Sequence, residues 1–589
     1  MKSFFKYLLA SILGVLISSI LLFFLFIGII SSMVSGEQAP FTAKPNSILH
    51  LKLSDPISDR APENPFGSFD APIVGNLKRL GLNDILDNIK KASEDDNIKG
   101  IYLDLSVVPT GTATVTEIRN ALRSFRDSGK FIVSSADVYL QKTYYLASVA
   151  DSVYLTPTGN LAFKGMSAQL IFFKKALDKL ELNPEIIRHG KFKSAVEPFM
   201  REDMSDANRK QIMTYMGSIW DFLLKGISEE RNIPVDKLNE LADNLTIRND
   251  KLAKQYGFID GIKYHDQVME VLQKMSGVNS VDDLHLVKLS DYKKAVHKTP
   301  YKGLPKDKIA VVYASGDIVM GEGGDGTMGS EKISQAIRKA RKDPSVKAIV
   351  FRVNSGGGSA LASEIIWREA KLASQVKPVY ASMGDVAASG GYYILSGADT
   401  IIASPNTITG SIGVFGLLMN GNKFMSDKLG ITSDVARTNK HADFGSFFRP
   451  LTPYEREVIQ MGVEETYDDF ITHVAEGRNM TKANVDSIGQ GRVWSGDNAT
   501  QIGLVDMYGG LEDAIALAAK RTHLKNYRVI SLPRQEDPFQ KLMKELSNQA
   551  SVYFLQKELG VNFKYYESVK NAVQMKGIQA RMPYDLYIE

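Results

Sequence analysis

The fold is decided by residues 377–415, KPVYASMGDVAASGGYYILSGADTIIASPNTITGSIGVF. The pattern predicts an apolar strand at Val379–Ser382 and a helix at Tyr392–Ser396, with Ser389 among small residues at their junction. At the N-terminus of a helix, aligned backbone N–H groups favour developing negative charge beside a hydroxyl. Ser389 is therefore a candidate nucleophile, although serine is also a favoured helix N-cap and that simpler role is the commoner one.

A glycine-rich turn precedes this stretch. An apolar run at Ala348–Val353 is followed by Gly356, Gly357 and Gly358, and a helix is predicted at Ala360–Ala373. Glycines let the backbone approach a ligand closely and aim N–H groups at it. Beside a nucleophile, such a turn could form an oxyanion hole; otherwise it is an ordinary turn between strand and helix. No Gly-Lys-Ser/Thr follows the glycines, which disfavours a phosphate-binding loop.

Length and composition limit the possible classes. A chain of 589 residues is too long for one core and predicts two to four domains. The net charge is +4, from 71 basic and 67 acidic residues, which gives no support for nucleic-acid binding. The chain has no cysteine, which excludes disulfides, thiol catalysis and cysteine-ligated zinc. No spacing typical of metal ligands is present either, so we expect neither a metal nor a cofactor.

The N-terminus carries a long apolar stretch, Tyr7–Met33. It is long enough to cross a bilayer of about 30 Å, whereas the apolar core of a cleaved signal peptide has about 7–15 residues. We therefore expect a retained signal anchor. Lys2 and Lys6 precede it, and the positive-inside rule then places the N-terminus in the cytoplasm and everything after about Gly36 outside it.

The rest of the chain contains an internal repeat. Each copy begins with an amphipathic helix, a turn and an apolar strand, and strands alternate with helices, which indicates an α/β fold with mostly parallel sheets. The matching segments, 246 to 248 positions apart, are Tyr144–Asp151 with Tyr392–Asp399 and Gly257–Asp260 with Gly503–Asp506. We therefore expect four parts: a signal anchor at 1–36, a first repeat at 37–300, a second repeat at 301–545 and a C-terminal extension at 546–589, in which no motif is recognised.

The two repeats differ where catalysis would occur. Gln141 stands opposite Ser389, and the stretch opposite the three glycines contains Pro109, which has no N–H to donate. The first repeat instead carries Lys193, opposite Ala442 in the second. Serine and lysine thus belong to different repeats.

A serine hydroxyl needs a base to become a good nucleophile. Lys193 can serve only when neutral, and burial beside Phe192, Val196 and Phe199 would lower its pKa by desolvation. By itself this lysine would more often be a solvated surface residue. The rival base is His441, with Asp443 as its orienting partner.

Four motifs together resemble the signal peptide peptidase A (protease IV) family in its long, tandem-repeat bacterial form. They are Asn-Ser-Gly-Gly-Gly-Ser at 354–359, Ala-Ala-Ser-Gly-Gly-Tyr-Tyr at 387–393, Thr-Gly-Ser-Ile-Gly-Val at 409–414 and Lys-Ser-Ala-Val-Glu-Pro-Phe at 193–199. The resemblance covers nearly the whole chain. One departure is Gly356, where the family usually has proline, and this leaves the second donor of the oxyanion hole undecided.

The resemblance implies a membrane-anchored serine protease whose two repeats share the fold of Clp protease and crotonases. It implies Ser389 as nucleophile, Lys193 as general base and Ser411 as the residue that orients the lysine. The oxyanion hole would use the amide of Gly390 and that of Gly357 or Gly358. It further implies signal peptides as substrates, a homotetramer, and a catalytic body on the periplasmic side of the bacterial inner membrane.

Two other classes remain open at this stage. One is a crotonase-like enzyme acting on acyl-CoA thioesters, which would need neither Lys193 nor an anchor. The other is a non-catalytic membrane scaffold, in which the serine and lysine motifs would be coincidental.

Overall fold

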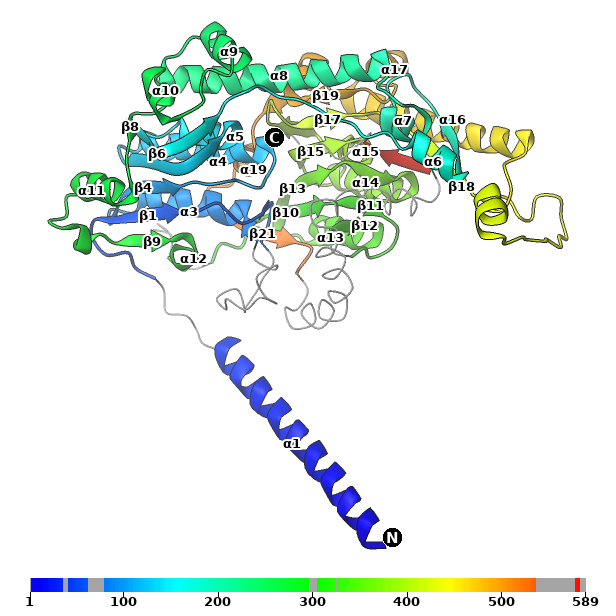
Figure 1. The fold of residues 1–589 in the computed structure, drawn as a ribbon, viewed down its shortest axis with the longest axis horizontal. Helices are drawn as coiled ribbons and strands as arrows, with labels where there is room; N and C mark the ends of the chain where they lie inside the picture. Colours follow the sequence, from blue (N-terminus) through cyan, green and yellow to red (C-terminus); the bar gives the residue numbers. More distant parts are fainter. Residues whose placement is uncertain are drawn as a thin grey trace.

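The computed structural model describes residues 2–34, 41–61, 79–295, 304–324, 326–535 and 578–582. Helix α1 (Lys2–Val34) extends away from the globular body (Figure 1). Judged over the described residues alone, no helix has the length and hydropathy of a membrane span.

The first repeat is built on a six-stranded parallel sheet in the order β8-β6-β5-β4-β1-β9. Its strands are β1 (Ser47–Leu51), β4 (Ile98–Asp104), β5 (Phe131–Leu140), β6 (Ser152–Ala162), β8 (Gly261–Ile262) and β9 (Leu286–Lys288). Its helices are α3 (Leu82–Glu94), α4 (Thr112–Asp127), α5 (Gln141–Ala147), α6 (Lys174–Leu180), α7 (Glu197–Met200), α8 (Asp206–Arg231), α9 (Val235–Asp243), α10 (Asp250–Gln255), α11 (His265–Ser276) and α12 (Leu289–Tyr292). A two-stranded parallel ladder of β2 (Ile57–Ser58) and β3 (Leu80–Gly81) lies before α3.

The second repeat has the corresponding sheet, in the order β19-β17-β15-β13-β10-β21, with β16 and β20 branching from β15. Its strands are β10 (Lys308–Ser315), β13 (Val346–Ser355), β15 (Val379–Ala388), β16 (Thr400–Ala403), β17 (Ile408–Gly410), β19 (Val493–Ser495), β20 (Met507–Tyr508) and β21 (Arg528–Leu532). Its helices are α13 (Ser330–Lys342), α14 (Ala360–Ser374), α15 (Gly390–Leu395), α16 (Pro453–Arg478), α17 (Lys482–Ile488), α18 (Gly496–Gln501) and α19 (Leu511–Arg521). Only the β17–β19 pair in this sheet is antiparallel, so the expected α/β class with mostly parallel sheets is confirmed.

A third, mixed sheet joins the two repeats. Its order is β12-β11-β14-β22-β18-β7, and β7 comes from the first repeat whereas β18 comes from the second. The strands are β7 (Asn183–Arg188), β11 (Asp317–Val319), β12 (Thr327–Gly329), β14 (Gly357–Ser359), β18 (Phe415–Asn420) and β22 (Ile578–Arg581). The loop that follows β7 carries Lys193, so this sheet brings the lysine of one repeat to the serine of the other.

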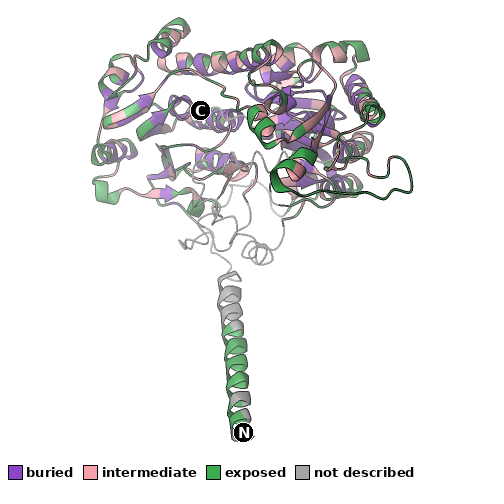
Figure 2. Ribbon diagram, turned by 45° about the vertical axis from the view of Figure 1, so that its right-hand side comes forward, coloured by how far each residue is buried: buried purple, intermediate pink, exposed green. Residues whose placement is uncertain are grey.

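The buried residues are concentrated in the sheets and in the helices that pack on them (Figure 2). Apolar side chains of each parallel sheet pack under helices on both faces, as expected for near-continuous apolar strands such as Val346–Ser355. A buried ionic contact also crosses between the repeats: Arg352 on β13 pairs with Asp59 at 2.7 Å and with Glu117 on α4 at 2.6 Å. The contact between the two repeats therefore includes a fully buried charged group.

The observed elements differ from the expected ones mainly in length. The strand expected at Val379–Ser382 runs on to Ala388, directly before Ser389, because its later residues pair with β17. The helix after it starts at Gly390 rather than Tyr392, and α14 matches its expected start at Ala360. The C-terminal extension, in which no motif was recognised, contributes β22.

Candidate active site

Ser389 stands between β15 and α15 in a strained backbone conformation, with φ 56° and ψ −117°. A positive φ is uncommon for a non-glycine residue and is found where the surrounding structure enforces it. The backbone N–H of Ser389 donates to the carbonyl of Gly410 at 2.8 Å, which ties the turn to β17. The residue occupies the N-cap position of α15, but its side chain makes no capping hydrogen bond. The hydroxyl faces the lysine instead, and its Oγ also lies 3.4 Å from the carbonyl oxygen of Gly413.

Lys193 reaches this hydroxyl from the loop between β7 and α7. Its Nζ lies 2.8 Å from Ser389 Oγ, 3.1 Å from Ser411 Oγ and 3.2 Å from the Ser411 carbonyl oxygen. The structure therefore brings together three residues that the sequence assigned to two different repeats.

The amine of Lys193 is fully buried. Burial lowers its pKa well below the ordinary value of 10.5, and among the described residues it pairs with no carboxylate. Val196, which the sequence placed beside it, is fully buried in a small apolar cluster with Phe415, and Phe199 packs against that cluster. Phe192 instead lies under the guanidinium of Arg492. Desolvation thus favours the neutral amine, the form that can accept a proton.

Ser411 is fixed by a turn at residues 489–492. Its N–H donates to the carbonyl of Arg492 at 2.7 Å, and the N–H of Gly491 donates to the carbonyl of Ile412 at 2.6 Å. Gly491 has φ 81°, and a Cβ placed on it would come within 2.6 Å of the Lys193 backbone. Only glycine lets this turn touch both the lysine and the strand end that carries Ser411.

The expected oxyanion glycines lie next to the serine. A Cβ placed on Gly357, where φ is 101°, would stand 2.7 Å from the amide nitrogen of Gly390. The N–H of Gly357 itself donates to Ser355 Oγ at 3.1 Å, whereas Gly358 pairs across the sheet with Ala580 of β22. Gly357 of the glycine turn therefore lies against Gly390, the residue that follows Ser389.

Gln211 on α8 supports the lysine loop and was not anticipated from the sequence. Its Nε2 lies 3.2 Å from the Phe192 carbonyl and 2.9 Å from Ser194 Oγ, the neighbours of Lys193 on either side. Its Oε1 accepts the N–H of Val493 from the second repeat at 3.1 Å. An isolated glutamine in an amphipathic helix gives no signal of such a role.

The rival base lies in a different network. His441 is bonded to Glu455 at 2.9 Å, and Asp443 is paired with Arg449 and Arg437. His441, Asp443, Arg437 and Arg449 lie in the segment 421–452 between β18 and α16, called the arm here, and Glu455 lies in the first turn of α16. The arrangement gives His441 and Asp443 a structural role in holding that arm to the start of α16.

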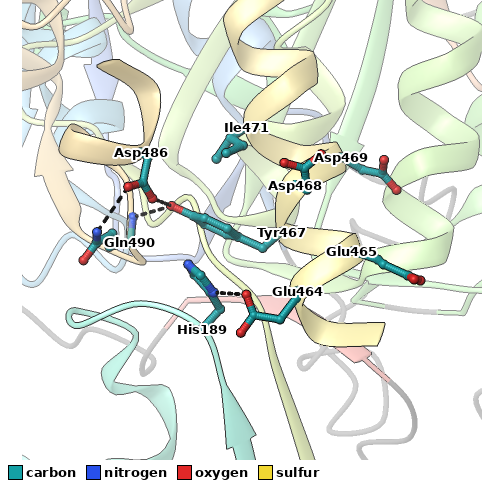
Figure 3. A pocket seen from close by; sticks show the side chains of 9 residues that line it. All are labelled: His189, Glu464, Glu465, Tyr467, Asp468, Asp469, Ile471, Asp486 and Gln490. Carbon is teal, nitrogen blue, oxygen red and sulfur yellow. Dashed lines mark hydrogen bonds and ion pairs between the residues drawn. The ribbon is translucent and has the colours of Figure 1, made fainter. Parts of the chain in front are cut away.

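An open pocket of about 730 Å³ lies on the outer side of the lysine loop (Figure 3). The ring of His189 stacks on Tyr467 with centroids 3.9 Å apart, and its Nδ1 lies 2.8 Å from Glu464. The Tyr467 hydroxyl donates to Asp486 at 2.7 Å and accepts the N–H of Gln490 at 3.1 Å. Neither Ser389 nor Lys193 lines this pocket, so it is not the proposed reaction site. Its Tyr467 side chain instead holds Gln490 of the 489–492 turn.

Comparison with known proteins adds a family to this geometry. The family model described as peptidase family S49 matches residues 124–279 and again 371–525, which confirms the repeat. The chain is 37% identical to Protease 4 of Salmonella typhi, covering 86% of this chain and 84% of that protein. It is 32% identical to the chloroplastic serine protease SPPA of Arabidopsis thaliana, covering 91% of this chain and 77% of that one.

Among solved structures, a ClpP1 mutant from Listeria monocytogenes matches with a TM-score of 0.24 and 15% identity, covering 35% of this chain and 94% of that one. The family match spans both repeats, and the relatives cover most of the chain. The protein therefore belongs to peptidase family S49 and is a serine protease related to Protease 4.

Proposed function

We propose that Ser389 and Lys193 form a Ser-Lys dyad that hydrolyses peptide bonds. The observation that carries this proposal is the 2.8 Å separation of Nζ and Oγ at a buried amine whose pKa is lowered by desolvation. A neutral amine has two N–H groups and one lone pair. The two oxygens of Ser411 can accept the N–H groups, which turns the lone pair toward the Ser389 hydroxyl.

In the acylation step, Lys193 takes the proton of Ser389 as Oγ attacks the carbonyl carbon of the substrate. The resulting ammonium then gives that proton to the leaving amine, and the neutral lysine next activates water to hydrolyse the ester. Both transfers occur at one nitrogen, so no histidine is needed.

The oxyanion would be held by backbone N–H groups at the glycine turn. We assign the first donor to Gly390, which follows the nucleophile and opens α15. Gly358 is the better candidate for the second donor, because the N–H of Gly357 already donates to Ser355. Gly357 would instead provide the space that lets the carbonyl group come close.

We further propose that the Tyr7–Met33 stretch anchors the protein in the bacterial inner membrane, with the catalytic body on the periplasmic side. Support comes from its apolar length and from Lys2 and Lys6 before it. Cleaved signal peptides left in the bilayer would then be the substrates, as the family resemblance implies, and the assembly would be a homotetramer. Protease added to cells with a permeabilised outer membrane should digest the region after the Tyr7–Met33 stretch. If this region is digested only after detergent is added, the proposed orientation is wrong.

A fluorophosphonate probe tests the nucleophile. We expect the probe to label Ser389, as read by peptide mass spectrometry, and to abolish hydrolysis of an unstructured protein substrate in proportion to labelling. Ser411→Ala serves as a comparison, because it should retain the labelled serine while hydrolysing more slowly. Labelling of another serine with loss of activity would overturn the assignment.

A further inference from the structure

The turn at residues 489–492 packs against the loop that carries Lys193. The N–H of Phe192, the residue before the lysine, donates to the carbonyl of Gln490 at 2.9 Å. A Cβ placed on Gly491 would come within 2.6 Å of the N, Cα and Cβ atoms of Lys193. The turn therefore lies directly against the lysine, and only glycine leaves room for this contact.

The same turn reaches the surroundings of the serine. Gly413, whose carbonyl oxygen lies 3.4 Å from Ser389 Oγ, has both the turn and the lysine as neighbours. A Cβ placed on Gly413 would come 2.8 Å from Gly491 and 3.4 Å from Cδ of Lys193. The turn thus contributes to the packing that leaves Lys193 fully buried.

The conformation of this turn needs support from outside it. Gln490 has φ 51°, which is uncommon for a residue other than glycine and persists where the surrounding structure enforces it. Figure 3 shows Tyr467 reaching from α16 toward Gln490, and the tyrosine hydroxyl accepts the Gln490 N–H at 3.1 Å. The hydroxyl in turn donates to Asp486 at 2.7 Å, and Tyr467 is only 3% exposed. One buried hydroxyl therefore holds the strained residue of the turn.

Tyr467 also contacts the lysine loop directly. The ring of His189, four residues before Lys193, stacks on the Tyr467 ring with centroids 3.9 Å apart and an interplanar angle of 23°. The backbone N–H of His189 donates to the carbonyl of Val414 at 3.2 Å, beside Gly413. The tyrosine thus holds the loop with its ring and the turn with its hydroxyl.

The open pocket of Figure 3 gives this contact a second consequence. Tyr467 and Gln490 line the pocket, whereas Lys193 does not. The pocket is also lined by five carboxylates, those of Glu464, Glu465, Asp468, Asp469 and Asp486. Water and negative charge both favour the ammonium form of a lysine. If the turn loosened, water from this pocket could reach the amine.

We propose that Tyr467 is a positioning residue, which keeps Lys193 in place and separates its amine from the water and charge of the pocket. This inference rests on the proposed Ser-Lys function. Tyr467 acts through the turn, where the carbonyl of Arg492 also accepts the N–H of Ser411 at 2.7 Å. A displaced turn would therefore move the residue that orients the amine and hydrate the amine itself.

The test is the pH dependence of kcat and KM for a peptide substrate, measured on the full-length protein in detergent. Tyr467→Phe keeps the ring but leaves the N–H of Gln490 without its acceptor. We expect kcat to fall about tenfold with KM unchanged, as for the loss of one buried hydrogen bond. The rising limb of the profile should also move to higher pH, because a hydrated amine holds its proton more firmly. Tyr454→Phe, at a 59% exposed position on the same helix, is the matched control and should behave as wild type.

The pH profile separates positioning from a merely structural role. A Tyr467→Phe enzyme whose kcat falls while the rising limb stays in place would overturn the proposal, and so would one that matches wild type. Ser389→Ala, measured on the same substrate, tests the proposed function separately. If that variant still hydrolyses the substrate, the dyad itself is wrong.

Two variants of His189 test the stacked contact. His189→Ala removes the ring that lies on Tyr467, and it should lower kcat and move the rising limb in the same direction. His189→Phe restores a ring but not the ion pair with Glu464, whose side chain is half exposed, and such pairs contribute little. We therefore expect His189→Phe to recover most of the activity that His189→Ala loses. If both variants lose activity equally, the stacked ring does not position the lysine loop.

Discussion

At the scale of single residues, the proposed Ser-Lys chemistry depends on keeping Lys193 uncharged. Burial removes the water that would stabilise the ammonium, and Ser411 offers hydroxyl and carbonyl oxygens rather than a carboxylate. A carboxylate in that place would stabilise the ammonium and raise the pKa of Lys193 again. Ser411 therefore offers acceptors that can orient the amine without adding a negative charge that would favour the ammonium.

Activity should accordingly rise with pH as Lys193 loses its proton, with a midpoint below 10.5. Lys193→Arg should be inactive at every accessible pH, because arginine stays protonated. The measurement is kcat/KM for a peptide substrate from pH 6 to 10. An active arginine variant would require another base.

The pH dependence of the free energy of unfolding should also reflect the lowered pKa of Lys193. Its pKa is lowered in the folded state, so between that value and about 10.4 the unfolded chain binds a proton that the folded chain does not. Folding is penalised below this window, and the penalty disappears as pH rises through it. Lys193→Met should therefore raise the free energy of unfolding at pH 7, and the gain should shrink toward pH 10. Lys191→Met, at an exposed position, is the control and should show no such trend.

Gln211 should act on the reaction only through Lys193. In Gln211→Glu the carboxylate cannot donate to the Phe192 carbonyl, and its charge would lie beside the lysine loop. We expect the rising limb of the pH profile to move to higher pH, since a nearby negative charge favours the ammonium. Gln501→Glu, at an exposed position, should leave the profile unchanged. A profile that falls in height but does not move would reduce Gln211 to a structural role.

At the scale of helices and strands, the sequence predicts those elements whose pattern lies within a short stretch of the chain. The strand that ends at Ser389, the glycine turn and α14 follow from apolar runs and from glycines, which act within a few residues. β22 could not be predicted this way, because four residues, Ile578–Arg581, become a strand only where two open edges meet them. Gln211 was missed for the same reason, since its value lies in contacts made across the fold.

The glycine turn offers a test with a neighbouring control. Gly357→Ala places a Cβ at a positive φ, 2.1 Å from the Ala580 carbonyl oxygen and 2.7 Å from the Gly390 nitrogen. It would obstruct the Gly390 N–H and should reduce kcat/KM by a hundredfold or more, as expected on losing an oxyanion donor (about 10²–10³). Gly356→Ala meets no atom nearer than 3.6 Å and should stay within a few-fold of wild type. Equal loss in both variants would show that the turn tolerates no side chain and has no specific hole.

At the scale of the whole molecule, Lys193 lies in the first repeat and Ser389 in the second. Buried contacts between the repeats help to hold these two residues in position. Arg352 of the second repeat is fully buried between Asp59 and Glu117 of the first, and it also donates to the carbonyl of Met383 on the strand that leads to Ser389. Burial alone would lower the pKa of Arg352, but the two carboxylates outweigh it and raise the pKa, so the residue stays charged. Glu117 in addition accepts the N–H of Leu511 at the start of α19 at 2.7 Å.

Glu117→Gln should therefore destabilise both repeats together. It keeps the size of the side chain but leaves Arg352 with one carboxylate, and breaking a buried ion pair costs up to about 3–5 kcal/mol. Denaturant unfolding, followed by tryptophan fluorescence, should give a lower midpoint and a single transition, because Trp220 lies in the first repeat and Trp367 and Trp494 lie in the second. Glu270→Gln, exposed on α11, should leave the midpoint unchanged. Two separate transitions in wild type would mean that the repeats fold independently, and the register between Lys193 and Ser389 would then have to come from the third sheet alone.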